Sequence, residues 1–189
     1  RFGQNVAMSG FGLTPPRGKN DVVLKTLTSW PIPKNQEENE GNLIKGAGEY
    51  EIKGLEIRGF SLSKESSEKF LKTVYKITDE EITLGFLGHL SEELPPEVFD
   101  ALKNSDILFL AVGGKPFLKP EAAAKILKQL SPKIAVASFF KIPGLKRSAS
   151  DWKDFAEEVG QKPEAAEKLT IRKKELREQK GMKLAVLKI

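Results

Sequence analysis

The sequence predicts an α/β protein in which β-sheets are sandwiched between helices. Its first half alternates apolar with charged residues, a pattern typical of strands with one buried face. Its second half alternates short apolar runs with segments of helical spacing, which is typical of parallel strands joined by helices. The 189 residues fit a single domain covering 1–189, long enough to bury roughly 70% of the unfolded surface.

The first half is predicted to form short strands and hairpins. Residues 21–26 are mostly apolar and follow turn-forming prolines, so they indicate a short buried strand. Residues 50–57 alternate around Lys53 and Gly54, which predicts a hairpin with one buried face. A second strand pair is expected at 74–77 and 82–87. Two polar stretches are expected to be surface loops: 34–42 and 61–69.

The second half is predicted to alternate strands and helices. The expected elements, in order, are a helix after Pro95 and Pro96, a strand at 107–112, a helix opening at Pro120, a strand at 134–137, a helix over 152–159, and closing strands at 169–171 and 183–189. The run at 107–112 is continuously apolar, as in a strand buried on both faces. The strand–helix–strand order implies a right-handed crossover between parallel strands.

Composition excludes several classes of chemistry. The chain has no Cys, so disulfides, thiolate catalysis and iron–sulfur clusters are excluded. It has no apolar run near the roughly 20 residues that span a bilayer, so we expect a soluble, cytoplasmic protein with no membrane partner. The net charge of +5 permits nucleic-acid binding, but the basic cluster Arg172-Lys173-Lys174 is followed by Glu175 and Glu178 and is interpreted as a solvated surface.

Several segments, taken together, resemble the small metal-dependent hydrolases of the metallo-β-lactamase superfamily. They occur in the family's order and spacing: FGLTPPR at 11–17, DVVLKT at 21–26, GEYEIKG at 48–54, LG at 87–88, VGG at 112–114 and FKIPG at 140–144. The resemblance implies an αββα sandwich, with two mixed sheets flanked by helices. The family's opening strand is not found and the chain begins with Arg1, so we expect that an N-terminal piece is missing.

The chain departs from this family at the positions that carry the chemistry. The resemblance places the metal-binding His-x-His-x-Asp-His motif on residues 27–32, a further His at Lys64, a bridging Asp at His89 and a last His at Phe139. The substituted positions are Leu27, Ser29, Pro31, Ile32, Lys64, His89 and Phe139. A zinc site needs about three or four ligands, drawn mainly from His and Cys. One His and no Cys cannot supply them, so we expect no metal and no cofactor.

His89 is the remaining candidate for a catalytic group. As the only imidazole it could act as a base, with Ser29 or Ser138 as a nucleophile, provided that the fold brings them together. The alternative is a buried His satisfied by a hydrogen-bonded partner, which its sequence neighbours favour. Gly113-Gly114-Lys115 is not a phosphate-binding loop, because Pro116 follows where Ser or Thr is required.

Three functions therefore remain open. The first is a pseudoenzyme that keeps the fold as a scaffold or binding module, for an unknown protein partner or for itself. The second is a hydrolase with altered, His89-dependent chemistry. The third is RNA binding, which the basic charge suggests and which the resemblance allows, because the superfamily includes nucleases. Trp30, Phe139 and Phe140 could stack on bases, although packing roles are favoured for Phe139 and Phe140. The loops at 61–69 and 115–119 are the predicted binding surfaces.

Overall fold

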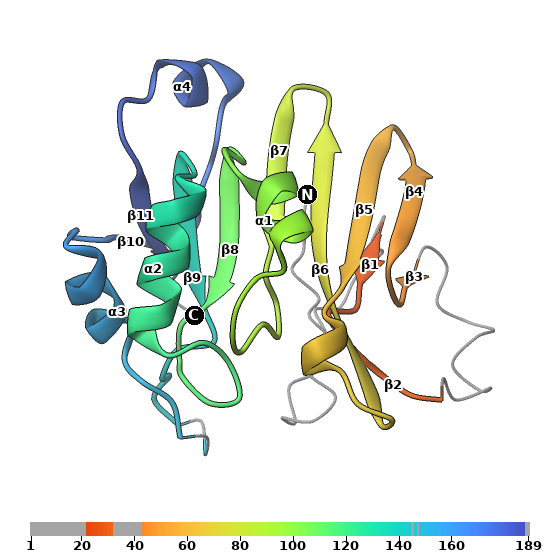
Figure 1. Ribbon diagram of the computed structural model, residues 1–189. Helices are drawn as coiled ribbons and strands as arrows, with labels where there is room; N and C mark the ends of the chain where they lie inside the picture. Colours follow the sequence, from red (N-terminus) through yellow and green to blue (C-terminus); the bar gives the residue numbers. More distant parts are fainter. Residues whose placement is uncertain (1–21, 32–42, 145, 147, 188–189) are drawn as a thin grey trace.

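The computed structural model describes residues 22–31, 43–144, 146 and 148–187. Its dominant feature is one nine-stranded mixed sheet (Figure 1). The strands, in spatial order, are β10 (Glu164–Ala166), β11 (Lys183–Leu187), β9 (Ile134–Ser138), β8 (Ile107–Ala111), β7 (Ile82–Phe86), β6 (Phe70–Asp79), β5 (Leu55–Ser61) and β4 (Gly48–Ile52), with β2 (Leu27–Ser29) paired to the start of β6. A second, two-stranded sheet joins β1 (Val23–Leu24) and β3 (Leu43–Ile44).

The sheet has an antiparallel half and a parallel half. Strands β4 to β7 pair antiparallel, as the predicted hairpins require. From β7 onward the strands β8, β9, β11 and β10 pair parallel. The predicted strand–helix–strand unit is confirmed by the parallel pairing of β8 with β9, which α2 connects in sequence.

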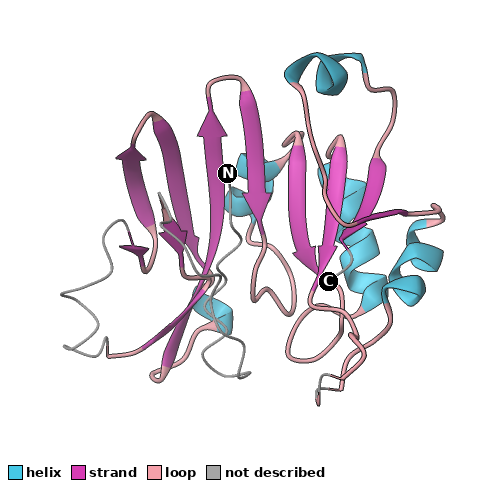
Figure 2. Cartoon of the chain, turned by 180° about the vertical axis from the view of Figure 1, so that it is seen from behind, coloured by secondary structure: helices cyan, strands magenta, loops and turns pink. Residues whose placement is uncertain are grey.

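Three helices cover one face of the large sheet: α1 (Pro96–Leu102), α2 (Pro120–Leu130) and α3 (Trp152–Val159). They lie in front of the strands in Figure 1 and behind them in Figure 2. Among the described residues, none of the helices has the length and apolarity needed to span a bilayer. The α/β class predicted from the sequence is confirmed, with one large sheet and one small sheet in the described part of the chain.

Alternation along the strands creates two apolar cores, one on each face of the large sheet. In β9, Ala135 and Ala137 face the helix side, whereas Ile134 and Val136 face the other side. A strand buried on both faces must be apolar throughout, which explains the unbroken runs seen in the sequence.

The C-terminal region differs from the prediction. Residues 169–171 are not a strand; Leu169 and Ile171 pack, partly buried, against the core of the second face from within a connection. Their side chains are apolar because they cover this core, and not because they pair in a sheet. The structure instead has the edge strand β10 and the six-residue helix α4 (Lys173–Glu178), whose only buried residue is Leu176.

Candidate functional site

The fold brings three of the segments that resemble the hydrolase family to one place. His89 follows β7, Phe139 follows β9, and Thr26 precedes β2. The His89 and Phe139 rings lie 5.9 Å apart, and Thr26 Oγ1 lies 2.8 Å from His89 Nδ1. A Cβ on Gly88 would stand 2.4 Å from Thr26 Cβ, so this close approach requires glycine.

His89 is deeply buried and only half satisfied. Its relative exposure is 4%, and its Nε2 atom has no hydrogen-bond partner among the described residues. Burial, and to a lesser degree the charge of Lys72, lower the pKa of His89 from 6.5 to about 4. The imidazole is therefore neutral at physiological pH.

Aromatic rings surround this imidazole. Phe117, from the loop between β8 and α2, lies 5.2 Å from the His89 ring and 4.5 Å from the Phe139 ring. Phe117 is only 2% exposed. Phe117 and Thr26 could not be predicted as neighbours of His89, since nothing in their local sequence marks them as such.

The remaining predicted residues lie apart from this cluster or on the surface. Leu27 is partly buried in β2, Ser29 and Pro31 are exposed, and Lys64 is exposed in a 3₁₀ turn at Ser63–Glu65. Ile32 lies outside the described residues. The Ser138 hydroxyl donates to Leu110 O at 2.9 Å. Neither candidate serine forms a hydrogen bond to His89 Nε2 in the described structure.

Next to Lys64, Glu65 forms a buried charged network that the sequence did not indicate. Lys72 Nζ donates to Glu65 Oε2 at 2.9 Å and to Ser91 Oγ at 2.7 Å. The Ser91 hydroxyl and the backbone N–H groups of Ser91 and Glu92 also donate to the Glu65 carboxylate. Burial by itself raises the pKa of Glu65, but these hydrogen bonds and the Lys72 charge together lower it below its usual value.

These residues do not fit the zinc site that the resemblance implies. In the described part of the chain, no group of three or more His, Cys, Asp and Glu side chains is placed to hold a metal ion. The position of a predicted ligand is taken by Phe139, whose ring has no lone pair to donate. The one imidazole has Nδ1 engaged by Thr26, its Nε2 is buried, and its ring lies beside the rings of Phe117 and Phe139. Zinc prefers several imidazole or thiolate ligands, which this cluster does not offer.

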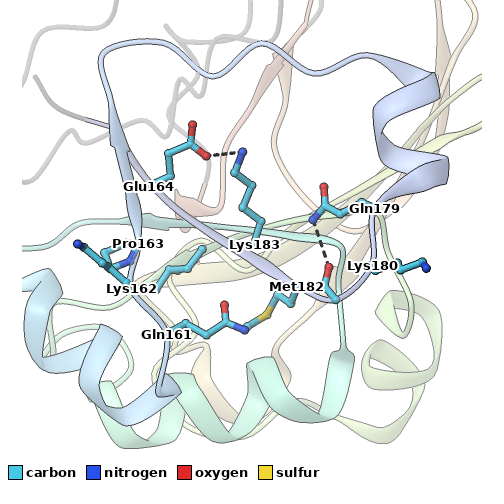
Figure 3. A pocket seen from close by; sticks show the side chains of 10 residues that line it. Gln161, Lys162, Pro163, Glu164, Gln179, Lys180, Met182 and Lys183 are labelled. Carbon is cyan, nitrogen blue, oxygen red and sulfur yellow. Dashed lines mark hydrogen bonds and ion pairs between the residues drawn. The ribbon is translucent and has the colours of Figure 1, made fainter.

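Two of the pockets on the described surface contain lysines. One, of about 420 Å³, lies at the carboxyl end of β8 and is lined by Gly113, Gly114, Lys115, Lys119, Pro120, Glu121, Ser148, Ala149 and Ser150; we call it the β8–α2 pocket. The other, of about 610 Å³, lies between the end of α3 and β11 (Figure 3); we call it the β11 pocket. In the β11 pocket, Lys183 is paired with Glu164, and Gln179 Nε2 donates to Lys133 O and Gly181 O.

The large mixed sheet and the order of its strands and helices are those of a metallo-β-lactamase-like fold. The sequence signature of the β-lactamase superfamily domain matches residues 6–138, and the chain belongs to that family. No curated protein matches the chain.

Solved structures agree on the fold. A Thermotoga maritima protein, named for the zinc-dependent hydrolases of the metallo-β-lactamase superfamily, superposes with a TM-score of 0.72 at 23% identity, covering 88% of this chain and 81% of its own. The metallo-β-lactamase fold protein YhfI from Bacillus subtilis gives a TM-score of 0.55 at 9% identity, and the match covers 88% of this chain and 61% of YhfI. The metallo hydrolase Igni18 from Ignicoccus hospitalis gives a TM-score of 0.52 at 19% identity, and the match covers 81% of this chain and 60% of Igni18. At these identities the likeness concerns the fold alone.

Proposed function

We propose that this protein is a pseudoenzyme of the metallo-β-lactamase superfamily, which uses the fold as a scaffold or binding module. The observation that carries the proposal is the environment of His89. The only imidazole of the chain is buried beside two phenylalanine rings, and its Nδ1 is held by Thr26.

Water activation needs a group that this cluster lacks. In metal hydrolases the ion lowers the pKa of a bound water toward neutrality. A general base must instead reach the proton that it removes, directly or through one water. His89 is 4% exposed and Thr26 is 2% exposed, so neither side chain is open to a substrate from solvent. A binding function asks only for a rigid surface, and the predicted surface at 115–119 coincides with part of the β8–α2 pocket.

The test is hydrolysis of a generic ester, a phosphodiester and a lactam by the wild type, His89→Asn and Lys64→Gln. The Asn side chain keeps a polar partner for Thr26, and Lys64→Gln is the control because Lys64 is exposed. We expect background rates for all three proteins. Turnover by the wild type and Lys64→Gln that disappears in His89→Asn would establish the alternative, a His89-dependent hydrolase.

A further inference from the structure

We propose that the β8–α2 pocket binds the phosphate group of a small, polar phosphate ester. This inference rests on the proposed function, because it names a ligand class for the surface at 115–119. The pocket borders the carboxyl ends of the parallel strands β8 and β9, which is where open α/β sheets place their ligands.

The walls of the pocket are tied to each other by the backbone. The Ser150 N–H donates to Gly113 O at 2.8 Å, and the Lys141 N–H donates to Ser150 O at 3.0 Å. A Cβ on Gly113 would stand 2.0 Å from Phe139 O, so only glycine allows the two loops to approach this closely. On the other side the Gly114 N–H donates to Leu118 O at 3.0 Å. The pocket is therefore formed before any ligand arrives, which reduces the entropic cost of binding.

The charge of the lining favours an anion. Lys115 and Lys119 both line the pocket, are exposed, and make no ion pair within the described residues. Glu121 is the one acidic lining residue, so the lining carries a net positive charge. Of the neighbouring described residues, Lys141 and Lys146 are basic and none between 141 and 150 is acidic, which adds to the positive potential beside the pocket.

The uncharged lining narrows the class of ligand. Ser148 and Ser150 also line the pocket, and a serine hydroxyl can donate to an acceptor on a ligand. A phosphate monoester carries nearly two negative charges and several acceptor oxygens, and so matches two ammonium groups and two hydroxyls. The apolar lining is limited to Pro120 and Ala149. A volume of about 420 Å³ therefore suits a small polar body, such as a sugar, better than a large aromatic one.

The β11 pocket is the natural comparison, because it also contains lysines. Lys162 and Lys180 line it and are exposed, and they too make no ion pair within the described residues. However, Glu164 neutralises the third lysine, Lys183, and Met182 and Leu184 add apolar surface. Figure 3 shows Lys162 and Lys180 at opposite ends of the view, so they do not converge on one group. Its lysines supply a matched control.

The experiment is an amide NMR titration of the full chain with inorganic phosphate, ribose 5-phosphate and uncharged ribose. We expect saturable shifts at Gly113, Gly114 and Ser150 with both phosphates, and none with ribose. The double variant Lys115→Gln/Lys119→Gln should weaken binding by about tenfold or more. The control Lys162→Gln/Lys180→Gln should bind as the wild type does.

Two results would overturn the assignment. One is the absence of saturable shifts with either phosphate. The other is an equal loss of affinity in both double variants, because it would indicate a general attraction of anions to a basic protein. Neither result affects the pseudoenzyme proposal, which depends on turnover. Conversely, His89-dependent hydrolysis with intact phosphate binding would overturn the pseudoenzyme proposal and leave the pocket assigned.

Discussion

His89 shows how the surroundings of one residue decide its chemistry. Its position in the sequence marks it as a candidate base, because it is the only imidazole and stands in a segment that resembles a metal site. Its contacts are those of a core residue: a hydroxyl on Nδ1 and two aromatic rings beside the imidazole. The cost of charging a side chain in such a place should be visible in the stability of the protein.

The first prediction is that the wild type loses stability on acidification through His89. The pKa of His89 falls from 6.5 to about 4 on folding, because burial disfavours the charged form. The unfolded chain therefore takes up this proton more readily than the folded chain. The neutral His89 side chain contributes about 3 kcal/mol to the free energy of unfolding. This contribution is complete above pH 6.5 and is lost as the pH falls toward 4.

Urea unfolding at a series of pH values between 7 and 4 measures this effect. In His89→Asn the free energy of unfolding should change less with pH in that range, while the Asn side chain keeps a partner for Thr26. The stability that the ionised Glu65 and Asp106 side chains contribute is lost at lower pH, because the pKa values of both carboxyl groups lie below their usual range. An unchanged slope in His89→Asn would mean that the imidazole is accessible to water in the folded state.

The second prediction concerns the rings beside His89. Phe117 is 2% exposed, and its replacement by Ala should lower the free energy of unfolding by about 3–5 kcal/mol. Phe139→Ala should cost less, since Phe139 is only partly buried. Phe139 packs on Phe117, with their ring centroids 4.5 Å apart, whereas Trp30 is 49% exposed and its replacement should cost little. If Phe117→Ala unfolded at the wild-type urea concentration, the packing described for this cluster would be wrong.

At the scale of elements, the Glu65 network joins three neighbouring elements of the fold. Glu65 ends a 3₁₀ turn, Lys72 lies in β6, and Ser91 follows β7. The side chains of Lys72 and Glu65 are only 11% and 5% exposed. A buried ion pair of this kind gives little net stability against an apolar replacement, but removing one partner leaves an uncompensated charge.

The third prediction follows from that asymmetry. Lys72→Met should destabilise the protein by about 3 kcal/mol, because the Glu65 carboxylate stays buried without its cation. The double variant Lys72→Met/Glu65→Gln should recover part of the loss. Lys69→Met is the control, since Lys69 is exposed in the same loop region. Thermal unfolding of the four proteins checks the order; a double variant less stable than Lys72→Met would contradict it.

The elements that the sequence predicted are those with a clear apolar period. The hairpin of β4 and β5, the buried strands β8 and β9 and the helix α2 were all predicted, because burial on defined faces dictates their residue pattern. Strand β10 was missed because Glu164 and Ala165 are exposed and the strand has no apolar pattern. Helix α4 was missed because a single buried residue, Leu176, does not establish a helical period.

At the scale of the whole molecule, the fold follows from the sequence more readily than the site does. The family resemblance assigns His89 and Phe139 to positions of the metal site, and in the structure their ring centroids lie 5.9 Å apart. Their partners could not be predicted, because Thr26 and His89 are 63 residues apart and meet only through the sheet. One side of the β8–α2 pocket, the loop at 115–119, was predicted as a binding surface. Its second wall, at 148–150, could not be predicted because tertiary packing brings it there.

The fourth prediction concerns the stability of the whole protein with and without zinc. A native metal site stabilises a protein by about 2.7 kcal/mol when the free ion is at 100 times its dissociation constant. For a chain of this size that would raise Tm by roughly 5–10 °C. The full sequence offers one His and no Cys, so we expect the same Tm in a chelator as in zinc, to within about 1 °C. Differential scanning calorimetry of the wild type and His89→Asn, each in zinc and in a chelator, measures these Tm values. A rise in Tm with zinc that is absent in His89→Asn would show that the cluster around His89 binds metal, and would overturn the expectation that this chain folds and functions without one.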